Sequence, residues 1–315
     1  MPLCRGSGGI PQLKKSPKIG GFRGLRRAKM PELPEVETIV NDLRPRIEGR
    51  RFTSASIYCP DMVHHTSVSE LRRRLPGQTI KEIARRGKYL IFRLVSGESL
   101  ILHLRMTGSL LLKRKSKPLA EPSPYVRAVF GLDNDEELLF TDRRKLGTIS
   151  LVKDENEEVG KLGPEPFEPG FTLKAMAKQL STRKAPIKAI LCDQKVIAGI
   201  GNMYADEALF FAGIHPLRTA NSLSEDEIKR LHQAIREVLT RAIGSGGASI
   251  SDYRRPTGEK GNQQYNFYAA HRGGQTCKVC ATPIERITVR NRGTYFCPKC
   301  QGKAAESTQI CFSNL

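Results

Sequence analysis

The 315-residue sequence has no long hydrophobic run. No stretch approaches the ~20 apolar residues that a helix needs to cross a bilayer, so the sequence excludes a helical membrane protein. The first 29 residues contain no apolar segment of signal-peptide length and no Asp or Glu, although they carry eight Lys and Arg. Two interpretations of this basic leader are open. It is either a weak organellar targeting segment or a stretch upstream of the true start at Met30, and we favour the second.

Acidic residues are few relative to basic ones over the whole chain. There are 52 Lys and Arg against 32 Asp and Glu, a formal charge of +20, and +12 remains when residues 1–29 are left out. Such an excess favours a polyanionic partner, with nucleic acid ahead of an anionic membrane surface. The alternative is a soluble basic protein with a solvated charged surface.

The eight cysteines are divided unevenly, because four are scattered and four are clustered at Cys277, Cys280, Cys297 and Cys300. With no secretion signal we expect a reducing cytoplasm, in which clustered thiols bind metal rather than form disulfides. Two Cys-x2-Cys pairs separated by 16 residues suit tetrahedral Zn2+, and four thiolates leave no open position, so this zinc is expected to be structural. The alternative is a reduced cluster without metal. Residues 284–289 and 294–296 alternate like a β-hairpin, on which Arg286, Arg290 and Arg292 are candidate phosphate contacts.

Periodicity and turn residues predict a multidomain α+β chain. Residues 34–46 have helical spacing, residues 51–153 contain short strands typical of an antiparallel β-sandwich, and residues 172–244 are helical. Ser224 and Glu227 form a capping box at the start of the clearest helix. Gly and Pro at 163–170 mark a boundary. The expected divisions are a leader at 1–29, a β-sandwich at 31–160, a helical domain at 161–248, a mobile loop at 249–270, a zinc finger at 271–302 and a disordered tail at 303–315.

Four short motifs carry candidate chemistry. If the chain starts at Met30 and this residue is removed, Pro31 becomes an N-terminal secondary amine with a pKa near 8 and is nucleophilic at neutral pH. The turn at 199–202 ends in Asn202 before a helix and suits a DNA phosphate, unless it is a plain helix–turn–helix packing unit. Residues 85–88 place three cations around a Gly, which is either a site or a solvated charge run. Met106 is either core filler or an apolar wedge for a base stack.

These stretches together resemble the bacterial formamidopyrimidine-DNA glycosylases over residues 30–302. The matching segments are PELPEVE at 31–37, RRGKYL at 85–90, HLRMTGSL at 103–110, LGPEPF at 162–167, GIGNMYADE at 199–207 and RGTYFCPKCQ at 292–301. The resemblance implies a β-sandwich with a leading helix, a helix-two-turn-helix domain and a Cys4 zinc-finger hairpin, with damaged double-stranded DNA between them. It also implies a monomeric bacterial enzyme near the nucleoid that removes oxidised purines and then nicks the strand.

The resemblance implies a role for each matching residue. Pro31 would be the nucleophile, Glu32 the acid/base for sugar ring opening, and Lys88 a phosphate contact and proton donor in β-elimination. Arg292 would act in δ-elimination or hold the phosphate. The loop 249–270 would cover the flipped base. The remaining DNA contacts would be Met106, which fills the space left by that base, together with Asn202, Arg183 and Lys188.

The sequence departs from the family pattern near the DNA. Asp142-Arg143-Arg144-Lys145-Leu146-Gly147 stands where the family has Asp-Pro-Arg-Arg-Phe-Gly, so Arg144 takes the place of the Arg that pairs with the orphaned base. Leu146 replaces an aromatic wedge, which puts the opposite-base preference in doubt. Tyr125 stands where the family has a phosphate-contacting His.

Two other functions stay open. One is the related endonuclease VIII activity on oxidised pyrimidines, although that relative more often begins Pro-Glu-Gly-Pro and Leu33 favours the purine enzyme. The other is a non-catalytic zinc DNA-binding protein, which is expected if the leader is retained and blocks Pro31. In that case the 315-residue chain is inactive, with the leader crowding the site.

Overall fold

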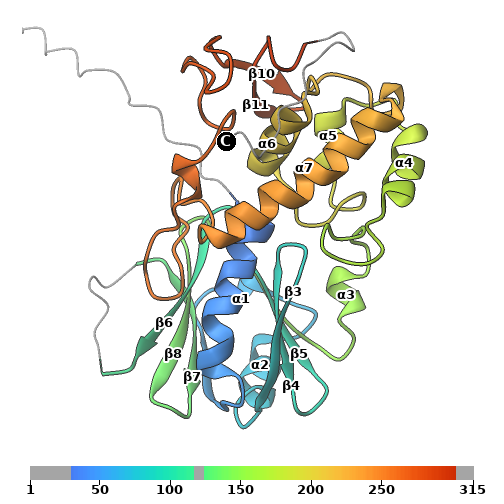
Figure 1. Cartoon of the computed structure of the whole chain (residues 1–315). Coiled ribbons are helices and arrows are strands. Elements are labelled where there is room, and N and C mark those ends of the chain that lie inside the picture. The colour runs from blue at the N-terminus through green and yellow to red at the C-terminus, as the bar shows by residue number, and fades with distance from the viewer. Residues whose placement is uncertain (1–29, 117–123, 303–315) are drawn as a thin grey trace, which may run out of the picture.

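The computed structural model describes residues 30–116 and 124–302. The expectations for the leader, including its crowding of the site, and for the tail at 303–315 lie outside these residues. The described chain has two lobes, a β-rich lobe and a helical lobe that also holds the zinc-finger hairpin (Figure 1). In the described residues no helix is long and apolar enough to cross a membrane.

Helix α1 (Leu33–Ile47) confirms the predicted leading helix. The backbone N–H of Glu32 donates to the side chain of Glu35 at 2.8 Å, and Pro34 lies in the first turn. Its apolar face, including Val36, Ile39 and Leu43, is fully buried in the core of the β-rich lobe. Burial of this face fixes the position of the two residues that precede the helix.

The β-rich lobe is the predicted sandwich. One sheet has the order β1-β7-β8-β6 and the other β2-β9-β5-β4-β3. The pairs are antiparallel except for β2 with β9, which are parallel, so the antiparallel expectation needs this one correction. Within the region 51–153 that was expected to contain short strands, turn residues at 96–98 and 133–135 join the antiparallel hairpins β4–β5 and β7–β8. The strands are β1 (Phe52–Ile57), β2 (Val63–His64), β3 (Ile80–Arg86), β4 (Tyr89–Leu94), β5 (Ser99–His103), β6 (Gly108–Arg114), β7 (Val126–Leu132), β8 (Glu136–Asp142) and β9 (Thr148–Val152), with α2 (Val68–Arg74) between β2 and β3.

The helical lobe follows a linker that contains α3 (Asn156–Val159). Its helices are α4 (Leu173–Ser181), α5 (Ile187–Leu191), α6 (Asn202–Ala212) and α7 (Glu225–Gly244). The capping box at the start of α7 is confirmed, since Glu227 N donates to Ser224 Oγ at 3.2 Å and Ser224 N to the Glu227 carboxylate at 2.8 Å. Within the region 172–244 that was expected to be helical, α5 ends at Leu191 and α6 begins only at Asn202, because the chain must turn back between them.

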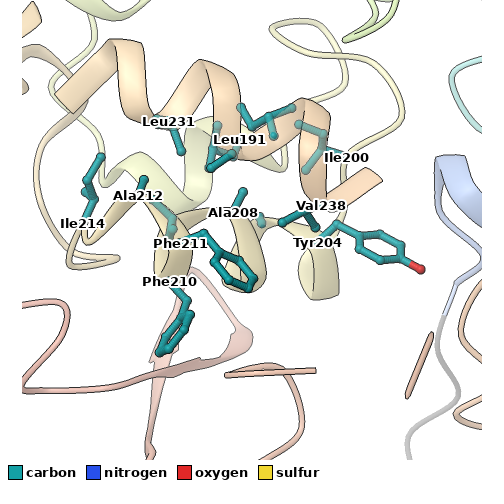
Figure 2. Close-up of a cluster of buried hydrophobic side chains, with 14 of the residues drawn as sticks. Leu191, Ile200, Tyr204, Ala208, Phe210, Phe211, Ala212, Ile214, Leu231 and Val238 are labelled. Carbon is teal, nitrogen blue, oxygen red and sulfur yellow. The ribbon is translucent and has the colours of Figure 1, made fainter. Parts of the chain in front are cut away.

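The zinc-finger hairpin consists of β10 (Glu285–Val289) and β11 (Arg292–Phe296). It is not a separate unit, because Cys277, Cys297 and Cys300 belong to the same buried cluster as α6 and α7. Figure 2 shows part of that cluster, in which Phe210 and Phe211 of α6 and Leu231 of α7 are among the buried side chains and the Tyr204 ring ends in its hydroxyl. The finger and the helical domain therefore share one core.

Candidate active site

The carboxylate of Glu32 lies at the N-terminus of α6. It accepts hydrogen bonds from the backbone N–H of Gly201 at 2.7 Å, of Met203 at 2.9 Å and of Tyr204 at 3.4 Å. Free N–H groups and the helix dipole make this position favourable for an anion. The side chain is only 3% exposed. The sandwich therefore supplies a carboxylate that the helical domain holds in a fixed orientation.

Lys88 brings an ammonium group to the same place. Its Nζ and Glu32 Oε1 are both 2.6 Å from the position that a Cβ on Gly201 would occupy. Lys88 is 3% exposed, and burial lowers its pKa, although the charge of Glu32 opposes this effect. A lowered pKa suits a group that must give and take protons near neutral pH.

The turn before Lys88 is rigid rather than solvated. Glu165 is buried and lies 2.8 Å from the Arg85 guanidinium, which is also 2.6 Å from Glu37. The backbone N–H of Gly87 donates to the same Glu165 carboxylate. Gly87 has φ +58°, a conformation that favours glycine. These contacts exclude the alternative of a solvated charge run for residues 85–88.

Asn202 and the zinc-finger hairpin meet beside this pair. Asn202 Nδ2 donates to the carbonyl of Gly293 at 2.7 Å, while its Oδ1 is buried without a partner in the described residues. The neighbouring Arg292 is exposed, and its charge acts on Lys88 and lowers the pKa of that amine. The hairpin turn therefore brings a second cation to the Glu32–Lys88 pair.

Lys188 does not lie on the DNA-binding surface, where the sequence predicted it. It is fully buried, and its Nζ donates at 2.5 Å to the carbonyl of Asn202 and to Asp206 Oδ1. Burial raises the pKa of Asp206 to about 7, against the lowering effect of Lys188. Because the ammonium is used within the protein, we correct the expectation of a direct phosphate contact. Lys188 supports the first turn of α6.

Pro31 precedes Glu32 and is buried. It lines a small cavity with Glu35, Met203 and Tyr253. In the 315-residue chain its nitrogen is acylated by Met30, so it is a tertiary amide without nucleophilicity. Pro31 therefore lies next to Glu32, and the chemical form of its nitrogen depends on where the chain begins.

Glu35 joins the start of α1 to the loop that follows α7. Its Oε1 accepts from the Tyr204 hydroxyl at 2.5 Å and from Ala248 N at 2.7 Å, and its Oε2 accepts from Glu32 N. The carboxyl is fully buried, and burial together with the charge of Glu32 raises its pKa to about 7. Tyr253 donates to the carbonyl of Glu35 at 3.3 Å. The base of the loop 249–270 is thus fixed against the first turn of α1.

A second group of predicted residues lies on two neighbouring turns of the sandwich. Met106 is half-buried on the turn after β5, and Arg144 and Leu146 are exposed on the turn after β8. Arg144 N donates to Thr107 Oγ1 at 3.1 Å, which joins the two turns. The structure therefore brings these three residues together.

Tyr125 and Arg183 complete the predicted DNA contacts. Tyr125 is 43% exposed just before β7, and its carbonyl accepts from Asp142 N at 2.8 Å. Arg183 follows α4 and is half-buried, and its Nε has no hydrogen-bond partner in the described residues. No contact joins Arg183 to the other predicted residues in the described parts of the chain.

The four clustered cysteines form the predicted metal site. Their sulfur atoms all lie within 4.8 Å of one another, with 3.4 Å between Cys280 and Cys297 and 3.9 Å between Cys277 and Cys300. Sulfur atoms about 2.3 Å from a tetrahedral Zn2+ lie about 3.8 Å apart, so this arrangement fits one ion. The set has four ligands and no open position, as a structural zinc requires.

Several residues of the site are not apparent from the sequence motifs. Glu35, Asp142, Glu165 and Asp206 are buried carboxylates that hold the turns of the predicted site residues in place. Each lies inside or beside a motif that was recognised for another residue. The signal that could have identified these four residues is an acidic residue inside an apolar or Gly-rich motif. Asp and Glu are rarely buried without partners, so such a position indicates a carboxylate with bonds inside the protein.

The chain matches three family descriptions in order. These are the formamidopyrimidine-DNA glycosylase N-terminal domain at residues 30–149, the formamidopyrimidine-DNA glycosylase H2TH domain at 162–254, and the zinc finger found in FPG and IleRS at 274–302.

Individual relatives agree with these matches. A formamidopyrimidine-DNA glycosylase of Symbiobacterium thermophilum is 43% identical over 276 residues, which cover 86% of this chain and 89% of the relative. The crystal structure of a Lactococcus lactis FPG point mutant with Fapy-dG-containing DNA is similar at a TM-score of 0.80 and 38% identity, covering 87% of this chain and 100% of that one. The wild-type Lactococcus lactis FPG with oxidised-pyrimidine-containing DNA is similar at a TM-score of 0.79 and 38% identity, with the same coverage.

A sandwich, a helix-two-turn-helix domain and a Cys4 hairpin that meet at a buried carboxylate and ammonium define a zinc-finger DNA glycosylase of DNA repair. Within that class, the chain belongs to the formamidopyrimidine-DNA glycosylase family.

Proposed function

We propose that this protein excises oxidised purines, 8-oxoguanine and formamidopyrimidines, from duplex DNA and then nicks the strand by β,δ-elimination. The observation that carries the proposal is the Glu32 carboxylate, held at the N-terminus of α6 next to Lys88 and one residue after Pro31. A relative of 38% identity has been solved with Fapy-dG-containing DNA, which supports the purine substrate class.

The active form begins at Pro31. In that form the proline nitrogen has a lone pair, and an α-amino group titrates near pH 8. The domain match begins at residue 30, which supports a start at Met30 with loss of that residue. The base must first leave the stack, because its sugar C1′ is not accessible inside a duplex. The loop 249–270, which begins beside Glu35 and Pro31, covers the extruded base.

The covalent steps follow from the three adjacent groups. The Pro31 nitrogen attacks C1′, and the bond to the base breaks with its electrons leaving on the base, which takes a proton from Lys88. The Glu32 carboxylate takes the proton that the Pro31 nitrogen loses and gives it to O4′ as the sugar ring opens. The product is an iminium ion, which acidifies the C2′ protons. Loss of one such proton expels the 3′ phosphate, and a second elimination expels the 5′ phosphate. Water then releases Pro31. Lys88 supplies and removes protons, which its lowered pKa favours.

The remaining predicted residues bind DNA in this proposal. Asn202 and Arg292 hold the phosphate beside the lesion, because Asn202 at the start of α6 bonds to the hairpin at Gly293, and Arg292 on that hairpin acts on Lys88. Met106 and Leu146 occupy the space left by the flipped nucleotide, and Arg144 pairs with the orphaned base. Tyr125 and Arg183 contact more distant phosphates.

One Zn2+ at Cys277, Cys280, Cys297 and Cys300 keeps the hairpin folded. The enzyme acts as a monomer in the bacterial cytoplasm, at the nucleoid.

Borohydride trapping tests the proposal. The chain beginning at Met30 is incubated with duplexes that carry 8-oxoguanine or an oxidised pyrimidine, and borohydride reduces any iminium to a stable adduct. We expect an adduct with the purine lesion and none after Pro31→Gly. A faster reaction with the pyrimidine lesion would instead assign the endonuclease VIII type of activity.

A non-catalytic DNA-binding protein is the second candidate, and the acylated nitrogen of Pro31 in the 315-residue chain favours it for that form. The 315-residue chain is tested beside the Met30 start. We expect it to bind DNA without forming an adduct. If neither form gives an adduct, the catalytic proposal fails.

A further inference from the structure

We propose that Asp142 is the positioning residue that sets how this enzyme discriminates the base opposite the lesion. The inference rests on the proposed function, because it assumes that Arg144, Leu146 and Met106 enter the DNA. Asp142 itself is fully buried at the end of β8 and cannot touch the duplex. It acts through the turns that carry those side chains.

The carboxylate of Asp142 holds its own turn through three backbone donors. Oδ1 accepts from Arg144 N at 3.0 Å, and Oδ2 accepts from Leu146 N and from Gly147 N, both at 2.8 Å. Lys145, between them, has φ +56°, which a non-glycine residue adopts only when its surroundings hold it there. The two exposed side chains are therefore presented from a turn closed around one buried anion.

The same carboxylate fixes the neighbouring turn. Thr107 Oγ1 donates to Asp142 Oδ1 and accepts from Arg144 N at 3.1 Å. Thr107 directly follows Met106, so the apolar wedge and the arginine are connected through one hydroxyl. Arg105, on the other side of Met106, has φ +50°. Neither turn can move without breaking a bond to Asp142 or Thr107.

The main chain of Asp142 extends this connection to Tyr125. Asp142 N donates to the Tyr125 carbonyl at 2.8 Å, and the Asp142 carbonyl accepts from Arg127 Nε at 2.7 Å. The Arg127 guanidinium also lies 6.0 Å from the centre of the Tyr125 ring. One buried residue thus connects four of the predicted DNA contacts.

This arrangement determines specificity rather than chemistry. Discrimination between opposite bases depends on the placement of Arg144 against base edges, where an error of about 1 Å costs on the order of 100-fold in rate. None of the bonds of Asp142 reaches Glu32 or Lys88, so the covalent site does not depend on it. Changing Asp142 should therefore alter the discrimination between opposite bases and leave the covalent chemistry unchanged.

The test uses Asp142→Asn. The substitution is made in whichever form of the chain, the Met30 start or the 315-residue chain, gives a borohydride adduct with abasic DNA. The carboxamide has nearly the same shape but turns a donor toward the backbone N–H groups. Asp133→Asn is the matched control, because Asp133 is exposed in the turn of the β7–β8 hairpin. Substrates are a duplex lesion opposite C, the same lesion opposite A, and a single-stranded abasic oligonucleotide. A 2-aminopurine base placed opposite the lesion reports insertion of the wedge by its fluorescence.

We expect Asp142→Asn to cleave the single-stranded abasic oligonucleotide within about twofold of wild type. On the duplex its kcat/KM should fall about 10- to 100-fold, with the ratio between opposite bases moving toward one and a weaker 2-aminopurine signal. Asp133→Asn should match wild type in every assay. Thr107→Val should show the same pattern to a smaller degree.

An unchanged opposite-base ratio in a folded, zinc-loaded Asp142→Asn enzyme would overturn the inference. If that variant does not fold, an unchanged ratio in Thr107→Val overturns it instead. A wild-type enzyme that cleaves no substrate refutes the proposed function, which is a separate result.

Discussion

Replacing Gly201 by Ala should abolish most of the chemistry while leaving the fold intact. The added Cβ would lie 2.4 Å from Glu32 Cδ, 2.6 Å from Glu32 Oε1 and 2.6 Å from Lys88 Nζ. Gly201 has φ −134°, so an alanine adopts its backbone conformation without strain. The effect of the methyl group therefore comes only from its contact with Glu32 and Lys88, the two side chains proposed to act in catalysis.

The size of the effect follows from the bonds that must move. The Glu32 carboxylate must give up or lengthen its bonds to Gly201 N and Met203 N, each worth about 1.5–3 kcal/mol as a bond to a charged group. A displacement of about 1 Å at a catalytic group costs on the order of 100-fold in rate. Overpacking lowers the free energy of unfolding by about 1–3 kcal/mol, which a folded domain usually tolerates. We therefore expect trapping to slow by about 100- to 1,000-fold.

The assay is the rate of borohydride trapping on an abasic duplex, measured with thermal unfolding and zinc content. Gly244→Ala is the control, because a Cβ there meets nothing within 4 Å. A Gly201→Ala enzyme that traps at the wild-type rate would refute the proposal that Glu32 and Lys88 act from the positions described above.

Three further predictions concern stability and metal. Burial raises the pKa of Glu35 to about 7, so between pH 4.5 and 7 the folded protein keeps a proton on this carboxyl that the unfolded chain has released. The free energy of unfolding should therefore fall by about 1–3 kcal/mol as the pH rises from 4.5 to 7. Glu35→Gln should flatten that slope in denaturant titrations. Lys188→Met leaves the buried Asp206 carboxyl without its hydrogen-bond partner, so it should destabilise the protein by about 1–3 kcal/mol, and Lys188→Met/Asp206→Leu should recover part of that loss in the same titrations. Removal of zinc by a chelator should lower the unfolding temperature of the helical lobe in calorimetry and leave that of the sandwich unchanged, since the cysteines lie in the helical core.

Local patterns predicted the elements of the fold well. Helix α1, the capped start of α7 and the two β-hairpins follow from periodicity and turn residues that act over a few positions. The zinc ligands could be predicted equally well from the sequence, because their spacing alone brings four thiols together. The parallel β2–β9 pair and the early end of α5 depend on contacts far away in sequence, which no local pattern contains.

The side chains of the site also fall into two groups, those that local motifs predict and those whose positions depend on contacts far away in sequence. The positions of Glu32 and Lys88 were predicted from motifs, but the use of the α6 N-terminus to hold Glu32 is a contact across 169 residues. Lys188 was misplaced for a related reason. A lysine in a helical segment looks solvent-exposed unless its buried partner, Asp206, is known to lie on the neighbouring helix.

The zinc finger and the helical domain are separate units in sequence but one unit physically. Gln301 receives a bond from Cys297 N at 2.8 Å and donates to the Ile214 carbonyl at 2.9 Å, while Asn202 binds the hairpin turn. The finger is therefore not an exchangeable cassette. A chimaera that carries the finger of another protein on this helical domain would have to match the surface of α6 as well as the four cysteines. Recombination at this boundary is restricted by packing rather than by metal chemistry.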